Sequence, residues 1–227
     1  MRWIIGDVHG MLRPLDSLLK EISRRDAHAK FYFVGDYVNR GPDTRGVIER
    51  LLALPNAKFI RGNHDDVLDH ILHGIGYADN PTHGDRFALF QWFLQHGLLQ
   101  TLRSYGATDQ HISRMISRRD AAAIEALGEL FPLDHRKFIR ELPAFIEDED
   151  LFVIHGKWPM KEKSSPREIL SDSSSPRRRH EVLWGRFEEV QLWQRKAWPK
   201  TGFFGHTPVQ TYANHQDDYT PIIAPQM

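Results

Sequence analysis

Three short apolar runs in the first third of this chain each end abruptly in a glycine followed by a polar residue. The runs are RWIIGD at residues 2–7, KFYFVGD at residues 30–36 and AKFIRGN at residues 57–63. Each run is rich in β-branched or aromatic residues and is bounded by a turn signal, which predicts a buried strand that enters a tight turn. This repeated ending constrains the fold most, because polar residues that follow neighbouring parallel strands gather at one edge of the sheet.

Helical patterns separate these three expected strands. The segment MLRPLDSLLKEISRR at residues 11–25 places its leucines and Ile22 on one face, and DTRGVIERLLAL at residues 43–54 repeats the pattern. The resulting alternation of strand and helix predicts an α/β fold built on a parallel sheet.

The rest of the chain predicts a helical region followed by a second group of strands. Residues from about 85 to 142 carry amphipathic helical patterns, which we interpret as a helical cover over one flank of a single domain that spans residues 1–227. AFIEDEDLFVIHG at residues 144–156 predicts a hairpin, and TGFFGHTP at residues 201–208 predicts another strand with a turn. Residues 161–180 are rich in Ser, Pro and charge, which predicts an exposed loop.

Composition excludes several classes of function. Lys plus Arg and Asp plus Glu both number 30, so no overall charge favours binding to a nucleic acid polymer or an anionic membrane. The chain has no cysteine, which excludes disulfides, thiolate metal sites and thiol nucleophiles. MRWIIGDVHG reaches a motif without an apolar leader, and no apolar run approaches the roughly 18 residues of a spanning helix. We therefore expect a cytoplasmic monomer.

Seven polar residues follow the expected strands and form the candidate site. A single Gly-Asp pair usually marks only a turn, and a single histidine at a strand end is usually structural, but seven such residues at one sheet edge indicate a site. Oxygen and imidazole ligands without thiolates suit manganese, iron, zinc or nickel. The seven residues are Asp7, His9, Asp36, Asn63, His64, His155 and His206.

The motifs GDVHG, GDYVNRG and GNHD resemble the three signature blocks of the phosphoprotein phosphatase family within the calcineurin-like metallophosphoesterases. Those blocks ordinarily read GDxHG, GDxVDRG and GNHE. The resemblance extends from Met1 to about Thr211 when the two late histidines are included. It implies a four-layer α/β/β/α sandwich of two mixed sheets, with a dinuclear metal centre at one end.

The resemblance also implies a role for each matched residue. Two divalent cations are implied, with manganese expected and iron, zinc or nickel as alternatives. A hydroxide held between the metals would attack phosphorus directly. In the implied scheme Asp7 and His9 hold the first metal, and Asp36 bridges both metals. Asn63, His155 and His206 hold the second metal. Arg40 and Arg186 bind phosphate with Asn63 beside them, and His64 donates a proton.

Two features depart from the family pattern. Asn39 stands where the family has an aspartate that accepts a hydrogen bond from the catalytic histidine. The amide oxygen of Asn39 could still accept this bond from His64, but it offers no charge to stabilise the imidazolium. We therefore expect lowered turnover or an acid-shifted optimum, with metal binding intact. The ending DDYTPIIAPQM also stops before the final strands that the family usually adds.

Three functions are compatible with these motifs. The main expectation is a serine/threonine protein phosphatase that acts on a phosphorylated protein or another small phosphoester. The first alternative is a bis(5'-nucleosyl)-tetraphosphatase-like nucleotide hydrolase, because close relatives share the same metal blocks. The second alternative, from another class, is a phosphate-binding module whose catalysis is damped by Asn39.

Overall fold

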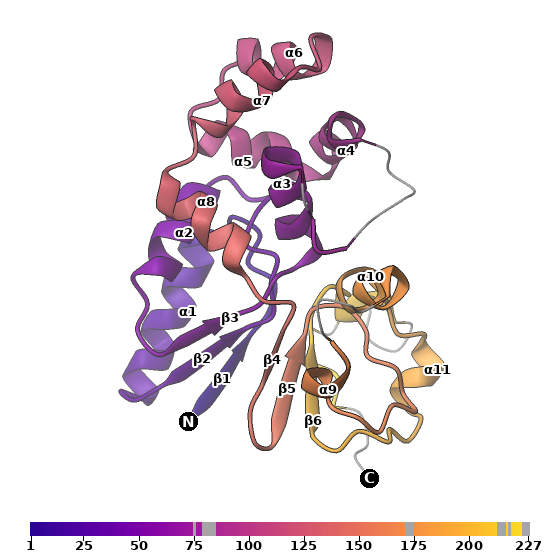
Figure 1. Ribbon diagram of the computed structural model, residues 1–227. Helices are drawn as coiled ribbons and strands as arrows, with labels where there is room; N and C mark the ends of the chain where they lie inside the picture. The colour runs from indigo at the N-terminus through magenta and orange to yellow at the C-terminus, as the bar shows by residue number, and fades with distance from the viewer. Residues whose placement is uncertain (75, 79–84, 171–174, 213–216, 218, 224–227) are drawn as a thin grey trace.

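The computed structural model describes residues 1–74, 76–78, 85–170, 175–212, 217 and 219–223. Its described strands form two three-stranded sheets in the middle of the molecule, with helices on both outer sides (Figure 1). The first sheet has the order β1-β2-β3 and the second has the order β4-β5-β6. The strands are β1 (Arg2–Ile5), β2 (Lys30–Phe33), β3 (Ala57–Phe59), β4 (Phe145–Glu147), β5 (Leu151–Ile154) and β6 (Thr201–Phe204).

The first sheet is parallel, as the sequence pattern predicts. Ile5 pairs with Phe33 of β2, which pairs in turn with Phe59 of β3. Helix α1 (Leu12–Arg25) joins β1 to β2, and helix α2 (Thr44–Leu52) joins β2 to β3. Each helical crossover returns the chain to the same end of the sheet, and this keeps neighbouring strands parallel.

The second sheet is mixed. β4 and β5 form an antiparallel hairpin around residues 148–150, and β6 pairs with β5 in parallel. The hairpin and the late strand are therefore confirmed. The expectation of two mixed sheets holds only for this sheet, because the described strands of the first sheet are linked by helical crossovers and are all parallel.

Alternation along the strands builds the four layers. Tyr32 of β2 packs between the sheets with Leu151 and Val153 of β5. The next residue along β2, Phe33, points to the opposite face and joins the cluster formed with α1 and α2. Phe152 of β5 likewise faces the outer cluster beside the C-terminal helices. Because successive side chains point to opposite faces of a strand, each sheet contributes to two cores, and the expected α/β/β/α layering is confirmed.

Helices cover the edge at which the polar turns lie (Figure 1). These helices share one buried cluster with β1 and β2, as expected for the helical cover. Among the described helices, none has both the length and the apolar composition needed to cross a bilayer. The elements are α3 (Asn63–His73), α4 (Arg86–Phe93), a kinked turn η1 (Leu94–Leu98), α5 (Leu99–Ser104), α6 (Asp109–Ser117), α7 (Ala121–Gly128) and α8 (Leu133–Glu141).

The region expected to be an exposed loop, residues 161–180, contains helical structure. Helix α9 (Pro166–Ile169) and the start of α10 (Pro176–Trp184) lie within it, while residues 171–174 lie outside the described residues. Each helix begins with a proline that follows a serine, a sequence that favours helix initiation. Pro166 and Leu170 are buried, so composition alone gave the wrong structure for these residues.

The chain continues through α11 (Glu189–Leu192) and β6 to a short helical turn, η2 (Val209–Thr211). The described residues after η2, which are 212, 217 and 219–223, contain no strand.

Candidate metal centre

The expected site residues meet at the carboxyl ends of five strands. Asp7 and His9 follow β1, Asp36 follows β2, and Asn63 begins α3 just after β3. The remaining two come from the second sheet, where His155 follows β5 and His206 follows β6. The site therefore lies across the ends of both sheets, beneath the helical cover (Figure 1).

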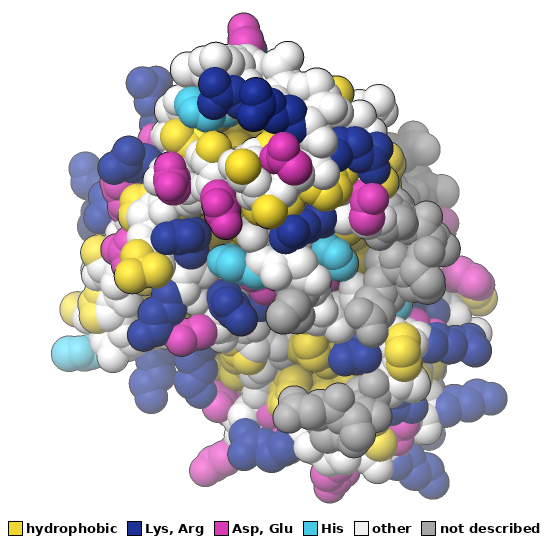
Figure 2. All heavy atoms as spheres, turned by 45° about the horizontal axis from the view of Figure 1, so that its top comes forward, with side chains coloured by type: hydrophobic (Ala, Val, Ile, Leu, Met, Phe, Trp, Pro, Cys, Tyr) yellow, Lys and Arg dark blue, Asp and Glu magenta, His cyan; other side chains and the backbone are white. Residues whose placement is uncertain are grey.

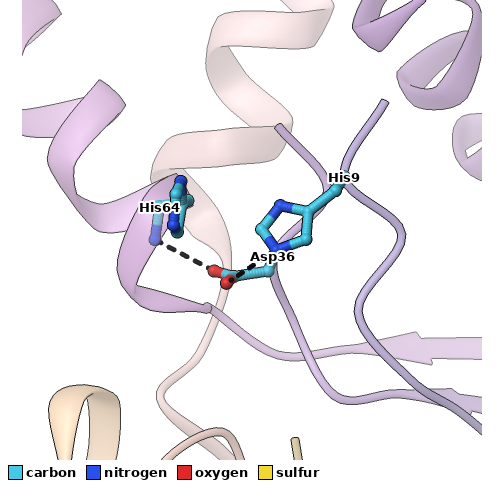
Figure 3. Close-up of side chains that lie close together, drawn as sticks. All are labelled: His9, Asp36 and His64. Atoms are coloured by element: carbon cyan, nitrogen blue, oxygen red, sulfur yellow. Dashed lines mark hydrogen bonds and ion pairs between the residues drawn. The ribbon is translucent and has the colours of Figure 1, made fainter. Parts of the chain in front are cut away.

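The Asp36 carboxylate lies at the centre of this cluster. Its Oδ2 atom is 3.5 Å from His9 Nε2 and 3.4 Å from His155 Nε2. The other oxygen, Oδ1, accepts a hydrogen bond from the backbone N–H of His64 at 2.9 Å. Figure 3 shows the His9 and His64 side chains near this carboxylate. Two groups of potential ligands share Asp36, one with His9 and His64 and the other with His155 and His206.

Hydrogen bonds orient two of the imidazoles toward Asp36. Nδ1 of His9 donates to the carbonyl of Val38 at 2.9 Å, and Nδ1 of His155 donates to the carbonyl of Val34 at 2.7 Å. A carbonyl can only accept, so each ring in its neutral form carries its proton on Nδ1 and has an unprotonated Nε2 that could bind a metal. Nε2 of His9 is buried and has no hydrogen-bond partner among the described residues. A metal cation would satisfy this atom, and such backbone-anchored imidazoles are typical of metal ligands.

The Asn63 amide oxygen completes the second group. Asn63 Oδ1 lies 2.9 Å from His155 Nε2 and 2.9 Å from His206 Nδ1. Three donor atoms from three separate elements therefore converge on one point. An amide oxygen and two imidazoles suit a first-row divalent cation, so these residues fit the implied metal.

Asp7 lies at the margin of the first group. Its Oδ2 atom is 4.0 Å from His9 Nε2, and its Oδ1 atom accepts a hydrogen bond from the His206 backbone N–H at 3.2 Å. The Asp7 side chain is 22% exposed, compared with 2% for Asp36. Asp7 thus links β1 to the turn after β6 and presents a carboxylate oxygen near His9.

The backbone at the centre adopts conformations that L-residues rarely adopt. Five expected site residues have positive φ angles, from 46° to 71°. Such residues cost roughly 1–3 kcal/mol each and persist only where their surroundings hold them. Their concentration here is therefore evidence of a functional constraint. The five are His9, Asp36, Asn39, Arg40 and His206.

Close contact between two turns requires glycine at two positions. A Cβ on Gly62 would lie 2.1 Å from Asp36 Oδ1, and one on Gly35 would lie 2.5 Å from the backbone nitrogen of Gly62. Gly35 also has a φ of +100°. The absence of both side chains lets the turn after β2 pack directly on the turn after β3, which brings Asp36 beside α3.

Electrostatics inside the cluster favour a bound cation. Burial opposes ionisation of Asp36, but His155 and the other nearby imidazoles together hold the pKa of this carboxyl well below its usual value. Burial also opposes protonation of His155, yet the attraction of Asp36 raises the pKa of His155 to about 9. A buried carboxylate that draws a proton onto its neighbour this strongly would also draw a divalent cation.

His64 contacts the two residues that the sequence places with it. Asn39 Nδ2 lies 2.8 Å from His64 Nδ1, and Arg40 Nη2 lies 3.3 Å from His64 Nε2. A neutral imidazole has only one acceptor nitrogen, so it cannot accept from both donors. Asn39 Oδ1, moreover, is buried without a partner among the described residues. We therefore infer the opposite amide orientation, in which this oxygen accepts from Nδ1–H and Nε2 accepts from Arg40.

The surroundings of His64 keep it neutral. Burial lowers the pKa of His64 to about 3, and the positive charge of Arg40 adds to this effect while Asp36 opposes it. Both ring nitrogens already have neighbours, which makes His64 a poorer metal ligand than His9. Nε2 remains the atom that could exchange a proton with a bound phosphate.

Both candidate phosphate-binding arginines lie at the centre. Arg40 and Arg186 are exposed, and Arg186 donates from Nη1 to the backbone carbonyl of His206 at 3.3 Å. Near the middle of Figure 2, histidine side chains lie close to Lys and Arg side chains on the surface of the molecule. Two guanidinium groups beside a cation site are well suited to phosphate oxygens.

Sequence reasoning missed three residues that hold the site turns in place. Asp65 accepts hydrogen bonds from the backbone N–H groups of Asp36, Tyr37 and Gly62, and so ties the turns after β2 and β3 together. Its position in GNHD, next to the expected acid, was the available signal.

The other two come from the helical cover. The Thr101 hydroxyl accepts from the backbone N–H of Asn39 at 2.7 Å, and the Gly97 carbonyl accepts from the backbone N–H of Arg40 at 3.1 Å. A Cβ on Gly97 would lie 2.3 Å from the Arg40 nitrogen. No local sequence signal connects residues so distant in the chain.

Two curated proteins are similar to part of this sequence. A protein from Marinomonas sp. (strain MWYL1) named "Bis(5'-nucleosyl)-tetraphosphatase, symmetrical" is 36% identical over 102 residues, which are 41% of this chain and 37% of the relative. A protein of the same name from Coxiella burnetii (strain RSA 331 / Henzerling II) is 32% identical, over 48% of this chain and 40% of the relative. The matched part of this chain thus spans less than half the length of these curated relatives.

A solved structure and a family profile were also matched. The crystal structure of a metallophosphoesterase from Sphaerobacter thermophilus is 24% identical, with a TM-score of 0.40, and covers 82% of this chain and 50% of that chain. The profile described as Calcineurin-like phosphoesterase matches residues 2–210, which is nearly the whole sequence. The chain therefore belongs to the calcineurin-like phosphoesterase family.

Proposed function

We propose that this chain hydrolyses dinucleoside tetraphosphates, as the names of its curated relatives suggest. The observation that carries the proposal is the Asp36 carboxylate shared by two groups of metal-ligand side chains. With two guanidinium groups beside it, this arrangement suits a substrate that carries several phosphates.

The residues present would hold two cations. His9 and Asp36, with Asp7 beside them, would hold one cation, and Asp36, Asn63, His155 and His206 would hold the other. When bound, two such divalent metals polarise phosphoryl oxygens and lower the pKa of water. Manganese is the metal we propose first, with iron, zinc or nickel as alternatives that the same donor atoms admit.

The remaining side chains would bind and orient the substrate. Arg40 and Arg186 would hold phosphate oxygens and offset their negative charge. Asn39 would fix the ring of His64 through Nδ1, so that Nε2 faces the substrate. Once the ring is protonated, Nε2 can pass that proton to the departing oxygen.

The uncharged partner of His64 favours an anhydride over a serine phosphate. Departure of a serine side chain leaves a strongly basic alkoxide, which needs a good proton donor. The leaving group of the tetraphosphate is a nucleoside diphosphate. Its terminal phosphate has a pKa of about 6, so it is only weakly basic. Because Asn39 supplies no charge to help protonate His64, the site is better suited to the second leaving group.

One series of assays distinguishes the tetraphosphatase hypothesis from the protein phosphatase hypothesis. Manganese-loaded protein would be given diadenosine tetraphosphate or a phosphoserine peptide under the same conditions, with products resolved by chromatography. We expect faster hydrolysis of the tetraphosphate, with adenosine diphosphate as the product if cleavage is symmetrical. Faster release of phosphate from the peptide would instead support the protein phosphatase expected from the sequence.

A third outcome would contradict both hydrolase hypotheses. If the protein binds metal but turns over neither substrate, the phosphate-binding module becomes the better account. Measuring metal content by mass spectrometry in the same samples distinguishes this outcome from simple loss of metal.

A further inference from the structure

A chain of aromatic rings leads from the metal centre to the surface between α4 and α10. Phe93 contacts the ring of His64 with a centroid distance of 5.1 Å, and Trp184 contacts the ring of His206 at 6.3 Å. Trp92 joins this pair, since its ring lies 4.9 Å from Phe93 and 6.0 Å from Trp184. Two indole groups thus lie within one or two ring contacts of His206, proposed as a metal ligand, and His64, proposed as the proton donor.

The two indoles differ from ordinary core residues in their exposure. Phe93 is buried, whereas Trp92 and Trp184 are both partly exposed. The rim around them is polar: His96, which contacts Trp92, is exposed, and His180, whose ring lies nearly parallel to that of Trp184, is partly exposed. A surface with apolar faces and polar edges is suited to a ligand that has the same character.

Each indole lies on a segment that also contacts or carries one of the two candidate phosphate-binding arginines. Trp92 precedes the kink at Gly97, whose carbonyl accepts the backbone N–H of Arg40. Trp184 ends α10, two residues before Arg186. The aromatic pair is therefore attached to the same two segments that position the guanidinium groups.

We propose that Trp92 and Trp184 form a stacking surface for the nucleobase of a nucleotide whose phosphates occupy the metal centre. This inference rests on the proposed function, because it assigns the base of that same substrate. A nucleobase presents a flat π-face with polar edges, and stacking on aromatic side chains contributes roughly 1–3 kcal/mol per base. A phosphoserine side chain has no ring, so the surface would favour nucleotides over phosphopeptides.

Binding of two matched ligands tests the proposal without turnover. Adenosine 5'-monophosphate and ribose 5-phosphate carry the same phosphate and sugar and differ in the base. Isothermal titration calorimetry of the manganese-loaded protein is expected to show tighter binding of the adenosine compound. In Trp92→Leu and Trp184→Leu we expect this preference to fall by about 5-fold to about 100-fold, while the affinity for ribose 5-phosphate stays the same.

Two further variants control for packing. Trp193→Leu removes an indole that is 51% exposed and lies outside the chain of rings, so the preference should remain unchanged. Trp184→Phe keeps a ring and should retain most of the preference. A purely structural role for Trp184 would lower affinity for both ligands together, in step with the melting temperature.

A spectroscopic measurement covers the case in which the leucine variants do not fold. Unaltered protein labelled with 5-fluorotryptophan has six indoles to observe by fluorine NMR. The adenosine compound should shift the Trp92 and Trp184 signals, assigned with Trp→Phe variants, more than ribose 5-phosphate does. The same two ligands would leave the Trp193 signal unmoved.

The possible failures are distinguishable. Equal affinity for the two ligands in the unaltered protein, or equal shifts of the two signals, overturns the stacking surface even if the tetraphosphate is hydrolysed. A clear base preference without hydrolysis of diadenosine tetraphosphate overturns the proposed function and leaves the stacking surface standing.

Discussion

Asn39 lies 2.8 Å from the imidazole of His64, so the residue that orients the candidate acid carries no charge. Burial already lowers the pKa of His64 to about 3. An aspartate at position 39 would stabilise the imidazolium and raise this pKa. Since an acid must be protonated to act, a higher pKa extends activity to higher pH.

We therefore expect Asn39→Asp to increase activity near neutral pH and to move the alkaline limb of the pH–rate profile upward. The gain should be larger for a phosphoserine peptide than for diadenosine tetraphosphate, because the alkoxide needs the proton more. The measurement is kcat against pH for both substrates, with metal content checked in each sample. An unchanged profile would contradict the role assigned to this pair.

Gly97→Ala is expected to displace Arg40. The new Cβ would lie 2.3 Å from the Arg40 nitrogen and 2.7 Å from its Cα, so the NRG turn must shift. We expect kcat/KM to fall by about tenfold or more, since small displacements of binding groups are costly.

Gly106→Ala provides a matched control for this change. Gly106 also has a positive φ angle, 86° against 93° for Gly97, but its Cβ would meet nothing within 4 Å. Both variants bear the backbone cost of a left-handed alanine, roughly 1–2 kcal/mol, and should lose similar stability from it. Equal kcat/KM in the two variants would exclude a positioning role for Gly97.

Asp36→Asn is expected to lower metal content below two ions per chain. The amide oxygen can still accept the His64 backbone N–H, which preserves the local fold, but the charge that attracts both cations is lost. Metal analysis after dialysis measures the change. Asp150→Asn, at a carboxylate that is 62% exposed, is the control and should bind as much metal as the unaltered chain.

Arg61→Met is expected to destabilise the fold strongly. Arg61 is buried and bonds to Asp66 at 2.8 Å and Asp69 at 2.9 Å, so its removal leaves two buried carboxylates without the guanidinium that offsets their charge. The free energy of unfolding should fall by about 3–5 kcal/mol, measured by urea denaturation.

An exposed ion pair gives the comparison for Arg61. Arg50 lies 2.6 Å from Asp16, with side chains 48% and 39% exposed. Arg50→Met should cost about 1 kcal/mol or less, because water screens this pair. A similar loss in both variants would mean that the buried network contributes no more than a surface contact.

Much of the architecture follows from local pattern. Each of the runs that end in Gly6, Gly35 and Gly62 contains a strand. The alternation of these runs with helices correctly predicts the parallel sheet. The convergence of the polar turns also follows, because parallel strands end at one edge. These features depend on residues close in sequence and on one general rule of sheet geometry.

Contacts between distant segments could not be predicted in this way. The close contact between Gly97 and Arg40 depends on how the helical cover packs. The short helices in residues 161–180 depend on the burial of Pro166 and Leu170. Serine and proline are compatible with both a loop and a helix start, so only the tertiary contacts decide between them.

The hydrogen bond from His155 to the Val34 carbonyl joins the second sheet to the first at the proposed centre. Each sheet by itself carries only part of the ligand set, so the cations would cross-link two halves of the chain encoded far apart. Metal binding should then add to the cohesion of the sheets by mass action. A polypeptide that ends before β5 would lack His155 and His206, and during synthesis the second site could form only after β6 and His206 emerge.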